Sequence, residues 1–232
     1  MSEPDDRPGP PGPREIGRRY DEGADGYDAR LASDPRTLRR FAILDEAQRA
    51  IARGVDRALE IGCGTGRLLA TLEARSVIGV DVSAALLVRA KARRLVVARA
   101  DAHALPFADG SFDAVLAGNA VFRYLDAARA LAECARVLRG GGRLAVHQYA
   151  AHPWSPRRPF GKLLDGHPGH LRSLEELRRP ARAAGLVEER VDLWRGLRLP
   201  PYLVRIPEPI AWRFWEQVTF VFRKPVDNRR RP

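Results

Sequence analysis

The chain contains 232 residues and carries a formal net charge of +11. This length suits one domain with small additions, and 45% hydrophobic residues is enough to form a sizeable core. No apolar run approaches the roughly 20 residues that a membrane helix needs, and the Pro-rich, acidic start lacks the pattern of a signal peptide. The composition therefore predicts a cytoplasmic protein without a membrane span. The two cysteines, Cys63 and Cys134, show no metal-ligand spacing and fit a reducing compartment.

The positive charge is open to two interpretations. It favours attraction to nucleic acid or another polyanion if the basic groups gather on one surface. However, arginine is scattered along the whole length, and the chain has only three lysines, Lys91, Lys162 and Lys224. This scatter favours a compositional bias over a working basic surface. The terminal run of arginines over 229–231 is expected to be a solvated tail.

The first third of the chain predicts a tail and then a helix. Residues 1–14 are rich in Pro, Gly and Asp, so almost nothing in them can be buried and disorder is expected. A helix is predicted over 34–53, where apolar residues follow a helical period, and Gly54 ends it.

From residue 55 onward the pattern alternates between short apolar runs and helical stretches. Ser83 is a plausible N-cap for one of the helices. Alternating strands and helices indicate βαβ units and a mainly parallel sheet. Strands are predicted over 55–61, 76–81, 95–101, 112–119 and 143–149, and helices over 67–75, 83–94 and 125–139.

The last third predicts a loop, a helix and two closing strands. A Pro-, His- and Arg-rich segment over 151–170 is typical of a functional loop. A helix over 173–185 has a capping-box pattern, Ser173 with Glu176, and Pro180 is expected to kink or interrupt it. Strands over 186–194 and 217–224 are expected to close the sheet as a hairpin with a long insertion.

The strongest local signal is a glycine-rich turn where the first strand ends, LEIGCGTG over 59–66. Glycines permit a tight turn and close approach of a ligand, and a following helix offers free N–H groups. A P-loop is excluded because Arg67, not a Lys-Ser or Lys-Thr pair, follows Gly66. The dinucleotide-binding fingerprint G-x-G-x-x-G is not matched either, because Arg67 stands where its last Gly should be. What remains is Gly62, Gly64 and Gly66 in the pattern G-x-G-x-G, with Glu60 two residues before it; a purely structural turn is the alternative.

Two aspartates follow this turn, each at the end of a predicted strand. Asp81 ends the second strand, where a carboxylate can accept hydrogen bonds from both ribose hydroxyls. Asp101 ends the third strand and precedes Ala102. Its carboxylate can accept from an adenine amino group, while the backbone N–H of Ala102 donates to a ring nitrogen. Either aspartate alone is equally typical of a helix cap or a turn.

These motifs together resemble the class I S-adenosylmethionine-dependent methyltransferases of the small-molecule type. The resemblance rests on LEIGCGTG, VIGVDVS, ADAHALPFADGSFDAVLAGN and ALAECARVLRGGGRLAV, which occur in order over about 55–149. It implies an α/β fold, a Rossmann-like doubly wound seven-stranded sheet with the last strand antiparallel. It also implies a disordered tail at 1–14, an N-terminal helical lid at 15–54, a methyltransferase domain at 55–224 and a basic tail at 225–232. One departure is Arg139 before the glycines, where the family usually has Pro.

The resemblance further implies a binding site for S-adenosyl-L-methionine. The glycine turn would face the methionine portion and the ribose, Asp81 would bind the ribose, and Asp101 with Ala102 would bind adenine. Asn119 would lie near the transferring methyl group, and Tyr27 is a candidate contact from the lid. The expected cofactor-binding residues are Glu60, Gly62, Cys63, Gly64, Gly66, Asp81, Val82, Asp101, Ala102, Asn119 and Tyr27.

The implied reaction is methyl transfer to an O, N or C atom of a small-molecule acceptor. Alternatives are an RNA methyltransferase using the basic charge, a nicotinamide-dependent oxidoreductase and a non-catalytic binding protein. No catalytic residue is assigned, because a general base is needed only when the acceptor must lose a proton; no metal is expected. Residues 20–31 and about 152–170 are expected to form the acceptor-side lid. Candidate bases are His147, Tyr149, His152, His167 and His170.

Overall fold

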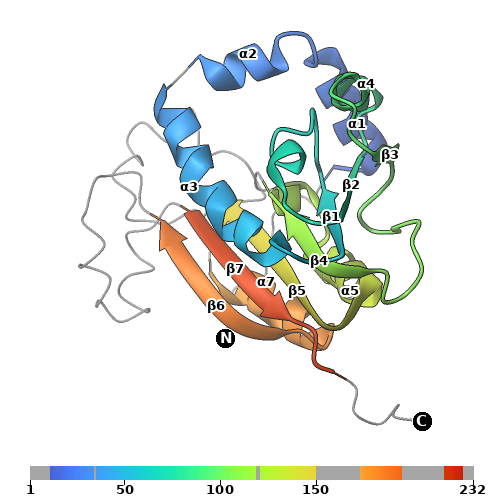
Figure 1. Ribbon diagram of the computed structural model, residues 1–232, viewed down its shortest axis with the longest axis vertical. Coiled ribbons are helices and arrows are strands. Elements are labelled where there is room, and N and C mark those ends of the chain that lie inside the picture. The colour runs from blue at the N-terminus through green and yellow to red at the C-terminus, as the bar shows by residue number, and fades with distance from the viewer. Residues whose placement is uncertain (1–10, 34, 119–120, 150–172, 195–216, 227–232) are drawn as a thin grey trace.

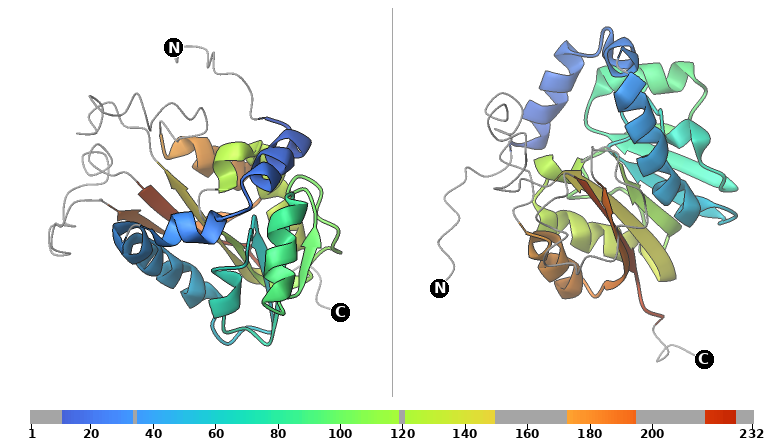
Figure 2. Two further views of the ribbon diagram at one scale, coloured as in Figure 1. Left: turned by 90° about the horizontal axis from the view of Figure 1, so that it is seen from above. Right: turned by 90° about the vertical axis from the view of Figure 1, so that its left-hand side faces the viewer.

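Figures 1 and 2 show the computed structural model, which describes residues 11–33, 35–118, 121–149, 173–194 and 217–226. A seven-stranded sheet forms its centre, with helices on both faces. Its strands are β1 (Arg57–Ile61), β2 (Ser76–Asp81), β3 (Val97–Arg99), β4 (Phe112–Ala117), β5 (Leu138–Tyr149), β6 (Val187–Trp194) and β7 (Gln217–Arg223). The helical elements are α1 (Pro13–Glu22), α2 (Tyr27–Ala32), α3 (Pro35–Ala52), η1 (Leu69–Thr71), α4 (Ala84–Ala92), η2 (Val121–Tyr124), α5 (Ala127–Val137) and α7 (Glu175–Ala183).

The strand order is β3-β2-β1-β4-β5-β7-β6. Strands β1 to β5 pair in parallel, whereas β7 is antiparallel to both β5 and β6. This confirms the predicted doubly wound sheet with an antiparallel last strand, and the predicted closing hairpin. The strand order reverses between β1 and β4, and ligands of such sheets bind beyond the carboxyl ends of the strands at that point.

Alternating side chains of β4 divide the core between the two faces of the sheet. Val115 and Ala117 pack with α5, α7 and the aromatic residues of β7. Ala114 and Leu116 point to the opposite face, where they pack with the end of α3. Figures 1 and 2 show α3 and α4 on one face and α5 and α7 on the other. All six residues of β4 are buried, as expected for a central strand of a parallel sheet.

The helix predicted over 67–75 is wrong. The Ala70 N–H donates to the Gly66 carbonyl at 3.0 Å, and the chain then tightens into the 3₁₀ turn η1 before Leu72 becomes extended. A 3₁₀ turn rises about 2.0 Å per residue against about 1.5 Å in an α-helix, so fewer residues carry the chain back to β2. The segment between β1 and β2 thus contains one 3₁₀ turn in place of the predicted helix.

Two further expectations about helices need correction. Pro180 was expected to kink or interrupt its helix, and interruption is wrong: α7 continues through Pro180, with neighbouring Leu177 and Ala181 buried against the core. At the start of the chain, Pro13 and Arg14 belong to α1, because Pro suits the first turn of a helix. Residues 1–10 and 227–232 of the predicted tails lie outside the described residues.

Several local predictions are confirmed. The Ser83 hydroxyl accepts from the Leu86 N–H at 3.2 Å and caps α4. The Glu176 carboxylate accepts from the Ser173 N–H at 3.1 Å, which is one half of the predicted capping box; the N-cap of α7 is Leu174 rather than Ser173, and no side chain caps the helix there. Within the described part of the chain, no helix is long and apolar enough to cross a membrane.

Candidate functional site

The glycine turn connects β1 to η1 at the carboxyl edge of the sheet. Gly62 and Gly64 have φ angles of +66° and +55°, which side chains rarely adopt. A Cβ atom on Gly62 would also lie 2.5 Å from Cγ2 of Val121, a clash that no small shift relieves. The turn therefore needs glycine both for its backbone conformation and for the close approach of η2. Gly66 packs behind the turn, where its Cβ would lie 2.2 Å from Leu95.

Asp81 braces this turn from the end of β2. Its Oδ2 accepts from the Gly64 N–H at 2.8 Å, and its Oδ1 accepts from the Ser83 N–H at 2.8 Å. Each carboxylate oxygen can accept a second hydrogen bond, so both remain able to accept from ligand hydroxyls. Burial raises the pKa of Asp81, although these two N–H donors act in the opposite direction. Hydroxyl donors of a bound ribose would favour the ionised form.

Asp101 is oriented by a histidine that the sequence pattern did not indicate. Oδ1 of Asp101 accepts from the His103 backbone N–H at 2.9 Å and lies 2.7 Å from His103 Nδ1. Nε2 of His103 accepts from the Asp126 N–H at 2.9 Å, so the ring proton resides on Nδ1 and points at Asp101. These contacts use Oδ1 of Asp101 and leave Oδ2 for a ligand amino group.

A cavity lies between this strand edge and the N-terminal helices. We call it the cofactor cavity. Both strand-end aspartates reach it, together with aromatic residues from α1, α2 and η2. It is lined by Pro13, Ile16, Tyr20, Tyr27, Gly62, Gly64, Val80, Asp81, Val82, Leu86, Ala100, Asp101, Ala102, His103, Gly118, Val121, Tyr124 and Leu125.

A second hollow shares Tyr27, Gly62, Gly64 and Gly118 with the cofactor cavity. It also contains Glu60, from β1. Oε2 of this carboxylate is buried and has no hydrogen-bond partner among the described residues. Burial raises the pKa of Glu60 well above its ordinary value, and nearby Arg67 opposes this. A buried carboxylate oxygen without a partner fits a ligand ammonium group, which would satisfy both its charge and its hydrogen bonding.

Acidic residues of α1 and α2 fasten these helices over the cofactor cavity. Asp21 Oδ1 accepts from the Ser83 hydroxyl at 2.6 Å and from the Ala85 N–H at 2.9 Å. These donors lower the pKa of Asp21. Asp28 accepts from the Thr65 hydroxyl at 2.7 Å and pairs with Arg93 at 2.6 Å. In Figures 1 and 2, α1 lies beside α4 and α2 continues over the sheet edge. The N-terminal helices α1 and α2 thus cover the cofactor cavity.

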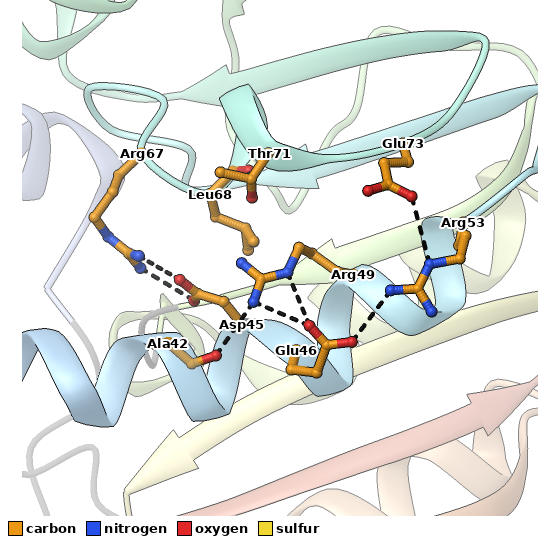
Figure 3. Close-up of polar contacts among 9 residues, drawn as sticks. All are labelled: Ala42, Asp45, Glu46, Arg49, Arg53, Arg67, Leu68, Thr71 and Glu73. Atoms are coloured by element: carbon orange, nitrogen blue, oxygen red, sulfur yellow. Dashed lines mark hydrogen bonds and ion pairs between the residues drawn. The ribbon is translucent and has the colours of Figure 1, made fainter.

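Helix α3 is fastened to the same turn from the other side. Figure 3 shows both terminal nitrogens of the Arg67 guanidinium directed at the buried Asp45 carboxylate of α3. The Arg67 guanidinium also lies 4.4 Å from the ring centroid of Phe41. Further along α3, Glu46 binds Arg49 and Arg53, and Arg53 reaches Glu73 beyond η1. Arg67 is therefore a structural partner of α3; it is the residue that stands where a phosphate-binding loop would have Lys.

The structure brings most of the expected binding residues to one edge of the sheet. Gly66 reaches neither hollow, and Asn119 lies outside the described residues. Among the candidate bases, His147 is buried between β5 and β7, with Nδ1 3.2 Å from the Thr219 hydroxyl oxygen, and it lines neither hollow. His152, His167 and His170 lie outside the described residues. The expected residues that line one or both hollows are Glu60, Gly62, Cys63, Gly64, Asp81, Val82, Asp101, Ala102 and Tyr27.

Comparison with known proteins agrees with this geometry. The family described as methyltransferase domain matches residues 59–146. A demethylmenaquinone methyltransferase of Roseiflexus sp. is 31% identical over 214 residues, which cover 88% of this chain and 87% of the relative. The chain therefore belongs to the class I S-adenosylmethionine-dependent methyltransferases. Membership in this family sets aside the nicotinamide-dependent alternative.

This chain is also similar to a second methyltransferase over part of its length and to a solved structure in its fold. A demethylmenaquinone methyltransferase of Beutenbergia cavernae is 36% identical over 153 residues, but the match covers 62% of this chain and 62% of that protein. Among solved structures, the cyclase SpnF superposes with a TM-score of 0.69 at 22% identity, covering 95% of this chain and 98% of SpnF. The latter similarity supports the fold alone.

Proposed function

We propose that this protein transfers a methyl group from S-adenosyl-L-methionine to an O, N or C atom of a small-molecule acceptor. The observation that carries the proposal is the convergence of Glu60, Asp81 and Asp101 on adjoining hollows beside the glycine turn. Three carboxylates beside one turn offer acceptors for the ammonium, ribose and adenine groups of one ligand. The relatives named for demethylmenaquinone and the family membership support a small acceptor.

Each residue has a binding role in this proposal. Oε2 of Glu60 would accept from the methionine ammonium, Asp81 from the ribose hydroxyls and Oδ2 of Asp101 from the adenine amino group. The backbone N–H of Ala102 would donate to an adenine nitrogen. Tyr27, which lines both hollows, would cover the ligand where they meet.

Bound S-adenosylmethionine would supply a methyl group already activated by a sulfonium. The contribution of the protein is then to align the acceptor and to exclude water. The acceptor forms a bond to the methyl carbon as the carbon–sulfur bond breaks, and the electron pair of that bond goes to sulfur. An acceptor that enters as an anion needs no general base, which agrees with the burial of His147 away from both hollows.

An RNA acceptor is less well supported. Many arginines of the described residues are engaged in ion pairs with carboxylates, which makes the positive charge a weaker sign of an open basic surface. These pairs include Arg67 with Asp45, Arg136 with Glu133, Arg143 with Glu189 and Arg178 with Glu188. We also propose a cytoplasmic location, supported by two buried cysteines that are not joined in a disulfide.

The test is binding followed by turnover. Calorimetry is expected to show micromolar binding of S-adenosylmethionine and of its demethylated product, worth roughly 8 kcal/mol. Tighter binding of NAD would contradict the proposal. Incubation with methyl-labelled cofactor and a cell extract should then place the label in the small-molecule fraction and not in the RNA fraction. Binding without any transfer of label would instead indicate a non-catalytic binding protein.

A further inference from the structure

Arg123 lies in η2, the next element after β4, and has an unusual environment for a partly buried arginine. Its guanidinium carbon lies 4.6 Å from the ring centroid of Tyr124 and 5.9 Å from that of Tyr149 at the end of β5. Nε of Arg123 is buried and has no hydrogen-bond partner among the described residues. Within the described part of the chain, the Arg123 side chain is hydrogen-bonded to the Tyr20 side chain, but no carboxylate is among the groups that act on its charge.

Other half-buried arginines are neutralised. Arg67 pairs with Asp45, Arg136 with Glu133 and Arg178 with Glu188. A guanidinium keeps its charge at any ordinary pH, and burial of an unpaired charge costs free energy. Among the described residues no carboxylate neutralises Arg123, and a bound anion would supply the missing negative charge.

The tyrosines around Arg123 connect it to the cofactor cavity. The Tyr20 hydroxyl donates to the Tyr124 hydroxyl at 3.0 Å, and both residues line the cavity. The rings of Tyr20 and Tyr124 meet edge to face, with centroids 5.9 Å apart. Tyr149 belongs to β5, which is separated from β1 by β4. The guanidinium thus lies toward β4 and β5, whereas Glu60 and the glycine turn lie at β1.

We propose that Arg123 binds the acceptor, and that this acceptor is an aromatic or conjugated molecule with an anionic oxygen. This inference rests on the proposed methyl transfer and specifies its substrate class. A carboxylate or an ionised phenol would pair with the guanidinium in a planar arrangement, and the tyrosine rings would pack against the rest of the molecule. An anion here would also attract the positively charged sulfonium.

The test measures binding of paired acids and amides in the presence of saturating S-adenosylhomocysteine. The probes are benzoate, 4-hydroxybenzoate and 4-hydroxycinnamate, each compared with its uncharged amide. The wild-type protein is expected to bind at least one acid about tenfold more tightly than its amide. In Arg123→Met, which retains the length but not the charge, this preference should disappear, and in Arg123→Lys it should partly return.

Arg129→Met, on the exposed side of α5, is the matched control and should keep the preference. The proposal is overturned if no acid is preferred by the wild type, or if Arg123→Met keeps the preference. It is also overturned if Arg123→Met loses affinity for S-adenosylhomocysteine itself, since Arg123 would then belong to the cofactor site. Failure of the wild type to bind S-adenosylhomocysteine would instead refute the proposed function, so the two failures are distinguishable.

Discussion

At the scale of single residues, Glu60 couples cofactor binding to protons. Burial raises its pKa in the free protein, and a ligand ammonium would lower it again. At a pH between the lower pKa of Glu60 in the complex and its higher pKa in the free protein, binding must therefore release a proton. Cofactor affinity should rise with pH until the pKa of the free protein is passed. Calorimetry in buffers of different ionisation enthalpy measures the release. Glu60→Gln should abolish it and flatten the pH dependence; unchanged proton release in that variant would show that Glu60 does not meet the ammonium.

The raised pKa of Glu60 also affects the stability of the free protein. A carboxyl group whose folded-state pKa is raised lowers the free energy of unfolding as pH rises from the unfolded to the folded pKa. The free protein should therefore become less stable over that range, and saturating cofactor should remove the loss. This behaviour is opposite to that of Asp21, whose pKa is lowered by its donors.

The two strand-end aspartates should differ in their contribution to cofactor affinity. Asp81→Ala is expected to cost about 2–3 kcal/mol of binding free energy, because a ribose offers two hydroxyl donors to one carboxylate. Asp101→Ala should cost about 1–2 kcal/mol, because adenine offers one amino group. Titration with S-adenosylhomocysteine checks both values, and Asp109→Ala, at an exposed carboxylate paired with Arg136, serves as control. Equal affinity in all three variants would contradict the assigned binding mode.

At the scale of elements, the N-terminal helices are held largely by a few part-buried polar contacts, whereas the sheet is held by a continuous core. Contacts of this kind open more readily than a packed core. We therefore expect α1 and α2 to act as a lid that orders further on binding. Hydrogen exchange over residues 13–31 should slow when S-adenosylmethionine is added, and again when an acceptor is added. Identical exchange in the free and bound states would leave these helices as a fixed part of the fold.

Asp21→Asn tests what fastens the lid. Loss of the charge should weaken the contacts with Ser83 and Ala85 and speed exchange in α1, with little change in α5. The same contacts are complete above the usual carboxyl pKa and should be lost as pH falls through the lowered pKa of Asp21. Glu15→Gln, on the first turn of α1, is a suitable control because it changes the same charge on the same helix.

At the scale of the whole molecule, β7 joins β5 to β6 and carries a large share of the core. Phe220 is fully buried and stacks on Phe222 with ring centroids 5.5 Å apart. Phe220→Ala should therefore lower the free energy of unfolding by about 3–5 kcal/mol in urea titrations. Val187→Ala, at a half-exposed position of β6, should cost well under 1 kcal/mol, in line with about ±0.5 kcal/mol for surface changes. A similar cost for the two variants would mean that β7 is not part of the cooperative core.

Much of the fold and cofactor site could be predicted from the sequence because the relevant signals are local. Hydrophobic periodicity reports which residues are strands and which are helices, and the glycines report a tight turn. A strand ending in Asp places its carboxylate at the sheet edge once the sheet is parallel, which is why Asp81 and Asp101 were expected in one site. The error at 67–75 arose because a helical composition does not distinguish an α-helix from a 3₁₀ turn.

Other features were decided by tertiary structure alone. The pairing of Tyr20 with Tyr124 joins residues 104 positions apart, and the docking of Asp21 on α4 spans 62. His103 orients Asp101 only because the start of α5 brings the Asp126 N–H to its other ring nitrogen. Arg123 differs from the paired arginines by what surrounds it, not by its sequence neighbours. The sequence determined the backbone frame and the residues at its edge, whereas side-chain partners across the molecule depend on packing, which no local pattern encodes.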